Sequence, residues 1–107
     1  MVSRNLMDEA AWQKRITDLC DVLAIKWWHD TDSRRNKSGL PDLILVGNRV
    51  LFAELKVRRN RPTAEQTEWI NALRNAGQEA VVWWPEQWPS VEKRLRDLSP
   101  RRMAAVR

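Results

Sequence analysis

A chain of 107 residues is long enough for one domain with one hydrophobic core and too short for two. Its single cysteine, Cys20, excludes an internal disulfide, and with the single histidine, His29, it also excludes a Cys/His zinc site within one chain. No signal peptide opens the chain and no apolar run approaches the ~20 residues of a membrane span, so we expect a cytoplasmic protein. The net charge of +5 favours a polyanionic partner.

The first third of the chain predicts a helix, a strand and a loop. Apolar residues recur at three- and four-residue steps through residues 6–24 and form one face of a helix. The apolar, tryptophan-containing segment 25–29 predicts a short strand. Residues 30–41 are polar and basic and contain Gly39 and Pro41, so they predict a loop.

A hairpin follows this loop. Two runs rich in β-branched residues, at about 42–46 and 49–57, flank Gly47-Asn48, which is a two-residue turn signal. This turn predicts that Val46 lies opposite Arg49 and that Asp42 lies opposite Ala53, one residue away from Glu54.

The second half of the chain predicts helix, strand and helix. Thr63 and Gln66 form a capping box for a helix over 63–76, and Gly77 ends it. Residues 79–84 predict a strand, and Pro89-Ser90 starts a last helix that ends near Ser99-Pro100. We expect one α/β domain over 1–107, with a core at about 6–98, a basic tail at 99–107, and a central mixed four-stranded sheet flanked by helices.

Three charged residues around the hairpin indicate chemistry. Strand alternation places Glu54 and Lys56 on the same face of an otherwise apolar strand, where an unpaired charge is costly. Asp42 opens the partner strand close to Glu54, and two neighbouring carboxylates repel unless a cation or a proton lies between them. Oxygen ligands of this kind suit Mg²⁺ or Mn²⁺. Each residue also has an alternative without chemistry: Glu54 and Lys56 as a surface ion pair of the kind found in any strand, and Asp42 as a common type of turn residue after a proline.

Two further residues have equally plain alternatives. Glu9 falls within about 20° of Ile16 on the helical wheel, which aims it towards the sheet, although an acid there also suits a helix N-terminus. For His29 we expect packing or a hydrogen bond rather than catalysis.

Together these segments resemble the PD-(D/E)xK nucleases. Asp42 in GLPD, eleven residues, and then Glu54-Leu55-Lys56 is similar to their signature. Glu9 in a first helix, DSRR at 32–35, SGLPDLIL at 38–45, LFAELK at 51–56 and TAEQTEWINALRNAG at 63–77 resemble its VRR-NUC branch over about residues 6–88, especially small viral and bacterial members. VRRNR at 57–61 is more basic than the usual connector of that branch.

The resemblance implies a restriction-endonuclease-like core, αβββαβ, and a role for each matching residue. Asp42, Glu54 and the main-chain carbonyl of Leu55 would bind Mg²⁺, or Mn²⁺ in its place, with Glu9 completing or supporting the site. Lys56 would orient or deprotonate the attacking water. Gln66 would point into the same site, although its capping box is a sufficient explanation for a glutamine there. No small-molecule cofactor is implied, and the expected products carry 5′-phosphate ends.

Two basic clusters flank these residues in sequence and predict contacts to DNA phosphates: Arg34, Arg35 and Lys37 before Asp42, and Arg58, Arg59 and Arg61 after Lys56. The alternative is a solvated charged loop. Of the seven tryptophans, we expect most to lie in the core and one or two to mark an interface.

The combined interpretation is a structure-specific DNA endonuclease, with the resolution of Holliday junctions as the narrower expectation. We expect it to act as a homodimer, because symmetric cutting needs two sites. A sequence-specific or nicking nuclease is a second interpretation. A DNA-binding module with an unused nuclease core is a third, and a plain basic interaction domain is a fourth.

Overall fold

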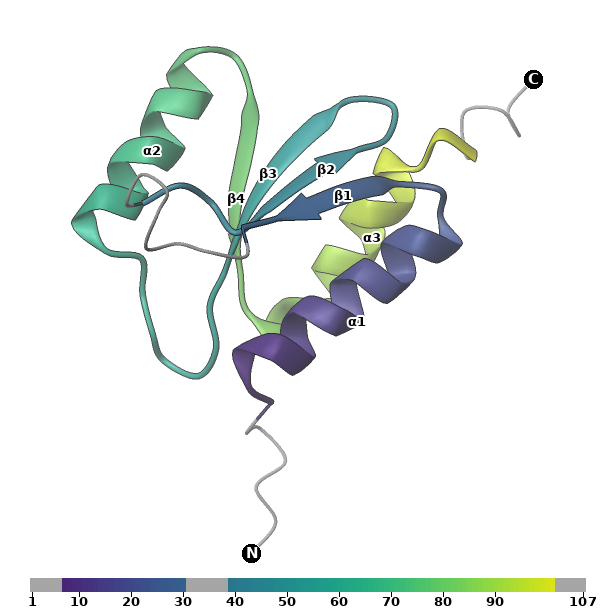
Figure 1. Cartoon of the computed structure of the whole chain (residues 1–107), viewed down its shortest axis with the longest axis horizontal. Coiled ribbons are helices and arrows are strands. Elements are labelled where there is room, and N and C mark those ends of the chain that lie inside the picture. Colours follow the sequence, from purple (N-terminus) through teal and green to yellow (C-terminus); the bar gives the residue numbers. More distant parts are fainter. Residues whose placement is uncertain (1–6, 31–38, 102–107) are drawn as a thin grey trace, which may run out of the picture.

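The computed structural model describes residues 7–30 and 39–101. In chain order its elements are α1 (Glu9–Val22), β1 (Lys26–His29), β2 (Leu43–Val46), β3 (Val50–Leu55), α2 (Ala64–Asn75), β4 (Glu79–Trp83), the 3₁₀ helix η1 (Pro85–Gln87) and α3 (Trp88–Leu98). The strands form one mixed sheet in the order β1-β2-β3-β4, in which only β3 and β4 run parallel (Figure 1). The predicted α/β fold is confirmed. No helix of these described ranges is long and apolar enough to span a membrane.

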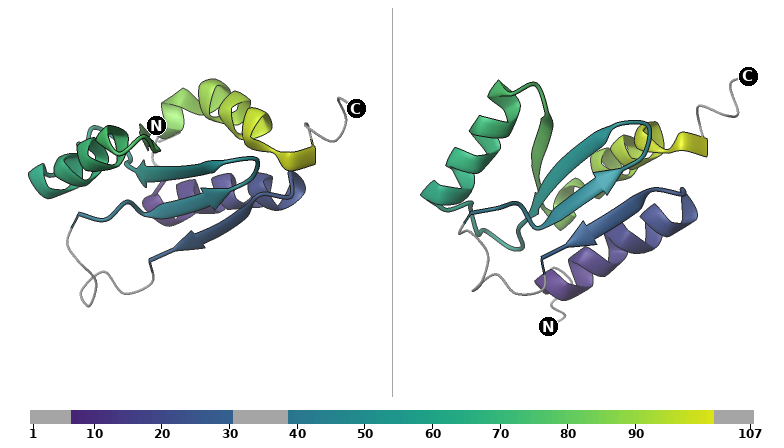
Figure 2. Two further views of the ribbon diagram at one scale, coloured as in Figure 1. Left: turned by 90° about the horizontal axis from the view of Figure 1, so that it is seen from above. Right: turned by 45° about the horizontal axis from the view of Figure 1, so that its top comes forward.

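One face of the sheet carries the core. Helices α1 and α3 lie side by side against this face, as both views in Figure 2 show. Alternate residues of β2 and β3 point towards the two helices and are buried beneath them. The fully buried side chains at the centre of this layer are Trp12, Ile16, Cys20, Leu43, Leu45, Leu51, Leu55, Leu95 and Leu98.

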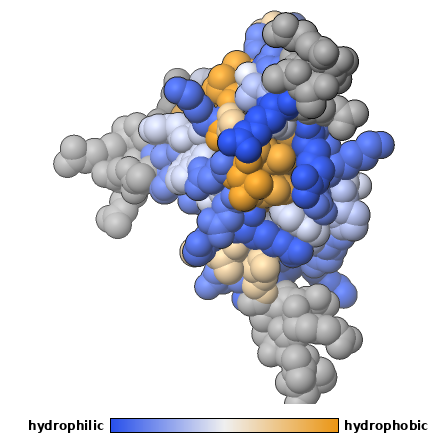
Figure 3. All heavy atoms as spheres, turned by 90° about the vertical axis from the view of Figure 1, so that its right-hand side faces the viewer, coloured by the Kyte–Doolittle hydropathy of each residue, from blue (hydrophilic) through white to orange (hydrophobic). Residues whose placement is uncertain are grey.

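The opposite face is only partly covered. Helix α2 packs beside β4, where Ile70 and Ala80 are buried. No described helix lies over β1 and β2 on this side, and Trp28 and Val46 are 49% and 41% exposed there. Figure 3 looks at the end of the molecule where α1 ends and the β2–β3 hairpin turns, and it shows hydrophobic side chains grouped among hydrophilic ones.

The tryptophans divide between the interior and the surface. Trp12 and Trp83 are buried, whereas Trp27 and Trp28 on the edge strand β1 are exposed. Trp28 lies on the outer face of β1, which no described helix covers, whereas Trp27 points to the other face, where its indole bonds Asp21.

The hairpin register differs from the prediction by one residue. Val46 pairs with Val50 and Leu43 with Ala53, so the loop holds three residues, 47–49, instead of two. The cause is a tertiary contact. The backbone N–H of Asn48 donates to the carbonyl of Leu98 at 2.9 Å, and its side-chain amide donates to the carbonyl of Asp97 at 2.8 Å. Asn48 therefore satisfies carbonyls at the end of α3, and Arg49 is drawn into the loop.

The observed helix ends differ from the predicted ones by a few residues. Helix α1 begins at Glu9 because the Asp8 carboxylate caps it, accepting from the N–H of Ala11 at 2.8 Å. The capping box of Thr63 and Gln66 is present as predicted. Helix α3 begins at Trp88, earlier than expected, and the 3₁₀ turn before it was not predicted.

Candidate active site

The hairpin brings Asp42 and Glu54 together. Since Leu43 pairs with Ala53, continuing the register places Asp42 opposite Glu54, one residue closer than the sequence predicted. The Oδ2 atom of Asp42 accepts a hydrogen bond from the backbone N–H of Leu55 at 2.8 Å. This bond fixes the aspartate across the two strands beside the glutamate.

Glu54 is a carboxylate in the interior of the protein. Its side chain is 1% exposed, and its Oε2 atom lies 3.3 Å from the Nζ atom of Lys56, which projects from the same side of the chain. Its Oε1 atom is buried and has no hydrogen-bond partner. An unpartnered buried oxygen costs free energy, so a structure that keeps one favours a further ligand at this position.

Burial and mutual repulsion raise the pKa values of both carboxyl groups. The pKa of Glu54 is raised to about 7, mainly by burial and also by the charge of Asp42, and against the lowering effect of the Lys56 ammonium. The pKa of Asp42 is likewise raised by burial and lowered by the Leu55 N–H and by Lys56. The two side chains lie within hydrogen-bonding reach when one is protonated. A pair poised in this way takes up either a proton or a cation near neutral pH.

Two more acids stand close to this pair. Glu9, in the first turn of α1, is exposed, yet its pKa is raised by burial and by the charge of Asp42 and lowered by Lys56. Asp30 follows β1, donates its N–H to the carbonyl of Asp42 at 3.4 Å, and adds its charge to the causes that raise the pKa of Asp42. Sequence reasoning identified Glu9 but missed Asp30, which only the pairing of β1 with β2 reveals.

These donors fit a small divalent cation. Mg²⁺ is commonly bound through one or two carboxylates, with water and substrate phosphate oxygens completing its shell. Asp42 and Glu54 supply such a pair, and the buried Oε1 atom of Glu54 would gain the partner it lacks. Across residues 7–30 and 39–101, no three Asp, Glu, His or Cys side chains are close enough to hold a metal. Glu9 adds a further negative charge beside Asp42.

The other predicted residues lie in different surroundings. The side-chain oxygen of Gln66 accepts from the N–H of Thr63 at 2.8 Å, so the structure shows its capping role. Arg58, Arg59 and Arg61 are exposed in the connection that follows Lys56. Arg34, Arg35 and Lys37 fall within 31–38, outside the described residues.

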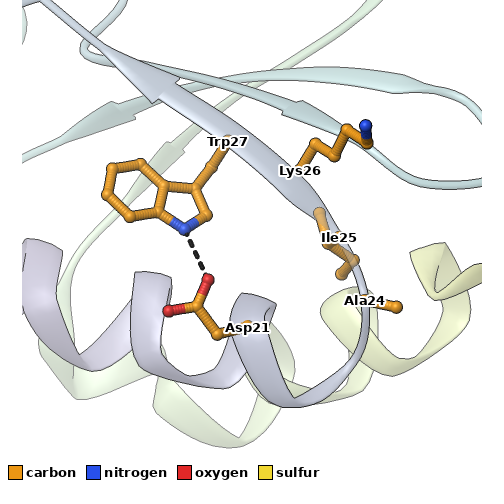
Figure 4. A pocket seen from close by; sticks show the side chains of 5 residues that line it. All are labelled: Asp21, Ala24, Ile25, Lys26 and Trp27. Carbon is orange, nitrogen blue, oxygen red and sulfur yellow. Dashed lines mark hydrogen bonds between the residues drawn. The ribbon is translucent and has the colours of Figure 1, made fainter.

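His29 and the first strand form a separate surface. The His29 ring stacks on Trp27 with centroids 5.9 Å apart, which agrees with packing as its role. A hollow of about 590 Å³ lies beside Trp27, where α1 ends (Figure 4). There Asp21 accepts a hydrogen bond from the Trp27 indole at 2.9 Å. Since Glu9 lies at the opposite end of α1, about 20 Å away by helix length, this hollow is distinct from the acidic pair.

The chain is similar to a known protein family and to a solved structure. The family model described as VRR-NUC domain matches residues 3–84. A solved structure of Hjc, a Holliday junction resolvase from the archaeal hyperthermophile Archaeoglobus fulgidus, is similar at 24% sequence identity and a TM-score of 0.44, covering 67% of each chain. No curated protein matches the chain.

Proposed function

Since the chain belongs to the VRR-NUC family of nuclease domains, which is part of the restriction-endonuclease-like superfamily, we propose that it is a divalent-metal-dependent, structure-specific DNA endonuclease. The proposed substrate is branched DNA such as a Holliday junction. The observation that carries the proposal is the buried Glu54 beside Asp42, with one oxygen unpartnered and Lys56 at 3.3 Å from the other.

Each residue of the site has a definable task in phosphodiester hydrolysis. Asp42 and Glu54, with the Leu55 carbonyl, would hold Mg²⁺ or Mn²⁺; when bound, the ion supplies Lewis acidity that activates water and offsets charge on the phosphate. Lys56 would orient the attacking water and offset charge on the phosphoryl oxygens. Its ammonium is held by Glu54, which keeps it within the site.

The basic residues beside the site supply DNA affinity. Arg58, Arg59 and Arg61 form no ion pair within the described part of the chain, so their charges are available to phosphates. Together with Arg34, Arg35 and Lys37 they would make binding strongly salt-dependent. Changing both Arg34 and Arg35 to alanine is expected to lower the slope of log affinity against log salt by about 2. An unchanged slope would remove these two from the interface.

The central test is a cleavage panel. Four-way junction, flap, single-stranded and linear duplex DNA are incubated with the protein and either Mg²⁺ or Mn²⁺, and we expect metal-dependent cutting of branched DNA with 5′-phosphate ends. Lys56→Ala and Asp42→Asn should each reduce the rate at least about 100-fold. Lys14→Ala, an exposed lysine paired with Asp18, is the matched control and should cut normally.

The same panel separates the alternatives. Cutting of linear duplex at fixed positions would indicate a sequence-specific enzyme, and a single cut strand would indicate a nicking enzyme. Binding without cleavage under both metals would indicate a DNA-binding module and would contradict the proposal.

We also propose that the active form is a homodimer. Symmetric cutting of a junction needs two sites related by a two-fold axis, and one chain offers one site. The outer face of β1 and β2, over which no described helix lies, is the candidate contact, because Trp28 and Val46 expose large apolar surface there.

A further inference from the structure

A hollow of about 390 Å³ opens beside the proposed active site. Four of its lining residues, Arg58, Arg59, Asn60 and Arg61, come from the connection between β3 and α2, and the fifth, Trp84, directly follows β4. The Trp84 indole N–H donates to the carbonyl of Asn60 at 2.9 Å. This bond joins the two segments, so the aromatic ring is held against the arginine-rich connection.

The connection itself has a defined shape. The N–H of Asn60 donates to the carbonyl of Val57 at 3.1 Å, which closes a turn. Arg58 has a φ of 55°, a left-handed conformation that a residue with a side chain adopts only where its surroundings hold it. The hollow is therefore a formed feature of the fold.

The arginines of the hollow differ from other arginines of the described ranges in their ion pairing. Arg49 and Arg94 share Glu79, and Arg96 pairs with Glu92. By contrast, none of the three arginines around the hollow forms an ion pair among residues 7–30 and 39–101. Three free guanidinium groups around one indole suit a ligand that is both anionic and aromatic, which is the chemistry of a nucleotide.

The hollow is next to the reacting centre. Arg58 comes two residues after Lys56, so their Cα atoms are at most about 7 Å apart. On the other side, the N–H of Lys56 donates to the carbonyl of Trp83, the residue before Trp84, at 3.0 Å. A DNA strand whose phosphate lies at Lys56 would thus place a neighbouring nucleotide beside the hollow.

We infer that this hollow binds one unpaired nucleotide adjacent to the cleaved phosphodiester, with its base against Trp84 and its phosphates on the arginines. The inference rests on the proposed function. The nucleotide must be unpaired, because a base inside a duplex offers only its edges, whereas an aromatic wall recognises the face of a base. The hollow would favour DNA with an unpaired base at the branch over fully paired duplex.

The test measures binding of the full chain to two flap DNAs in EDTA, so that no cleavage occurs. The flaps differ only at the unpaired nucleotide next to the branch, which in one of them is abasic. By fluorescence anisotropy we expect the flap with the base to bind about 5- to 100-fold more tightly. Equal affinity of the unmutated protein for the two flaps would overturn the inference and leave a site for phosphate alone.

Variants assign the effect to Trp84. Trp84→Leu should remove the difference between the two flaps and leave duplex affinity within about twofold, while Trp84→Phe should retain most of the difference. Trp27→Leu is the matched control, because Trp27 is likewise hydrogen-bonded through its indole N–H and lines the other hollow. If Trp84→Leu weakened the binding of flap and duplex DNA equally, Trp84 would shape the connection between β3 and α2 and would not contact a base, which would contradict the inference.

Failure of this inference is distinct from failure of the proposed function. A chain that discriminates between the flaps but cleaves no DNA with Mg²⁺ or Mn²⁺ would keep the nucleotide site and lose the nuclease assignment. A chain that cleaves branched DNA but binds both flaps equally would keep the nuclease assignment and lose the nucleotide site.

Discussion

Glu54 sets the pH response of the protein at the scale of single residues. Its pKa is raised from 4.5 to about 7, so between these values the folded state holds a proton that the unfolded state has released. Stability without metal therefore falls as the pH rises through this window, by on the order of 1–3 kcal/mol. Glu54→Gln removes this titration. We expect it to be more stable than the unmutated protein at pH 8, with the gain shrinking at pH 5, in thermal unfolding with EDTA. An equal difference at both pH values would contradict the burial argument.

Single residues of the site differ in how far the sequence predicts them. Alternation along one strand is enough to place Glu54 and Lys56 on the same side, because the period of a strand is fixed. Asp42 was identified because it opens the partner strand, but which residue lies opposite it depends on the length of the loop between the two strands. Asp30 was missed because its proximity arises from the pairing of β1 with β2, and an acid after a short strand looks like any loop residue.

At the scale of elements, the β2–β3 hairpin is locked onto the end of α3. A Cβ atom added at Gly47 would lie 2.0 Å from the carbonyl oxygen of Leu98, which is backbone and cannot turn aside. We expect Gly47→Ala to destabilise the fold by more than about 2 kcal/mol, measured by urea unfolding. Gly77→Ala is the control: nothing lies within 4 Å of its added Cβ, and only its φ of 87° is unfavourable, for about 1 kcal/mol. Equal costs would show that the hairpin moves freely.

The same contact explains why the register could not be predicted. Gly47-Asn48 is a two-residue turn signal when only local sequence is considered. Asn48 instead bonds to carbonyls about fifty residues later in the chain, and this tertiary contact lengthens the loop. By contrast, the capping box of Thr63 and Gln66 is wholly local, and it was predicted correctly.

At the scale of the whole molecule, metal binding and folding are linked. A cation that binds only the folded state stabilises it by about 2.7 kcal/mol at a hundred times its Kd. Because protons compete for Asp42 and Glu54, the melting temperature should rise with added Mn²⁺ at pH 8 and much less at pH 5. Asp42→Asn should abolish the rise. A similar shift in Asp42→Asn would place the ion elsewhere on the protein.

The uncovered face of the sheet leads to a prediction about assembly. Trp28 pairs across the sheet with Ile44, and Lys26 with Val46, so these side chains share the outer face. A lysine at position 28 would place a second ammonium in the proposed contact, where it would lose hydration without a partner. We therefore expect the unmutated chain to be a dimer and Trp28→Lys a monomer by light scattering.

Trp27→Lys serves as the control for this change. The Trp27 side chain points to the opposite face of the same strand, where it bonds Asp21, so the Trp27→Lys protein should remain dimeric. Loss of the dimer in both variants would mean that β1 as a whole is damaged. Trp28→Lys should still bind DNA but should cut only one strand of a junction in each binding event, because a monomer carries a single pair of Asp42 and Glu54. Paired cuts made by a monomer would show that two-fold symmetry is not needed, and the case for the outer face as an interface would then fail.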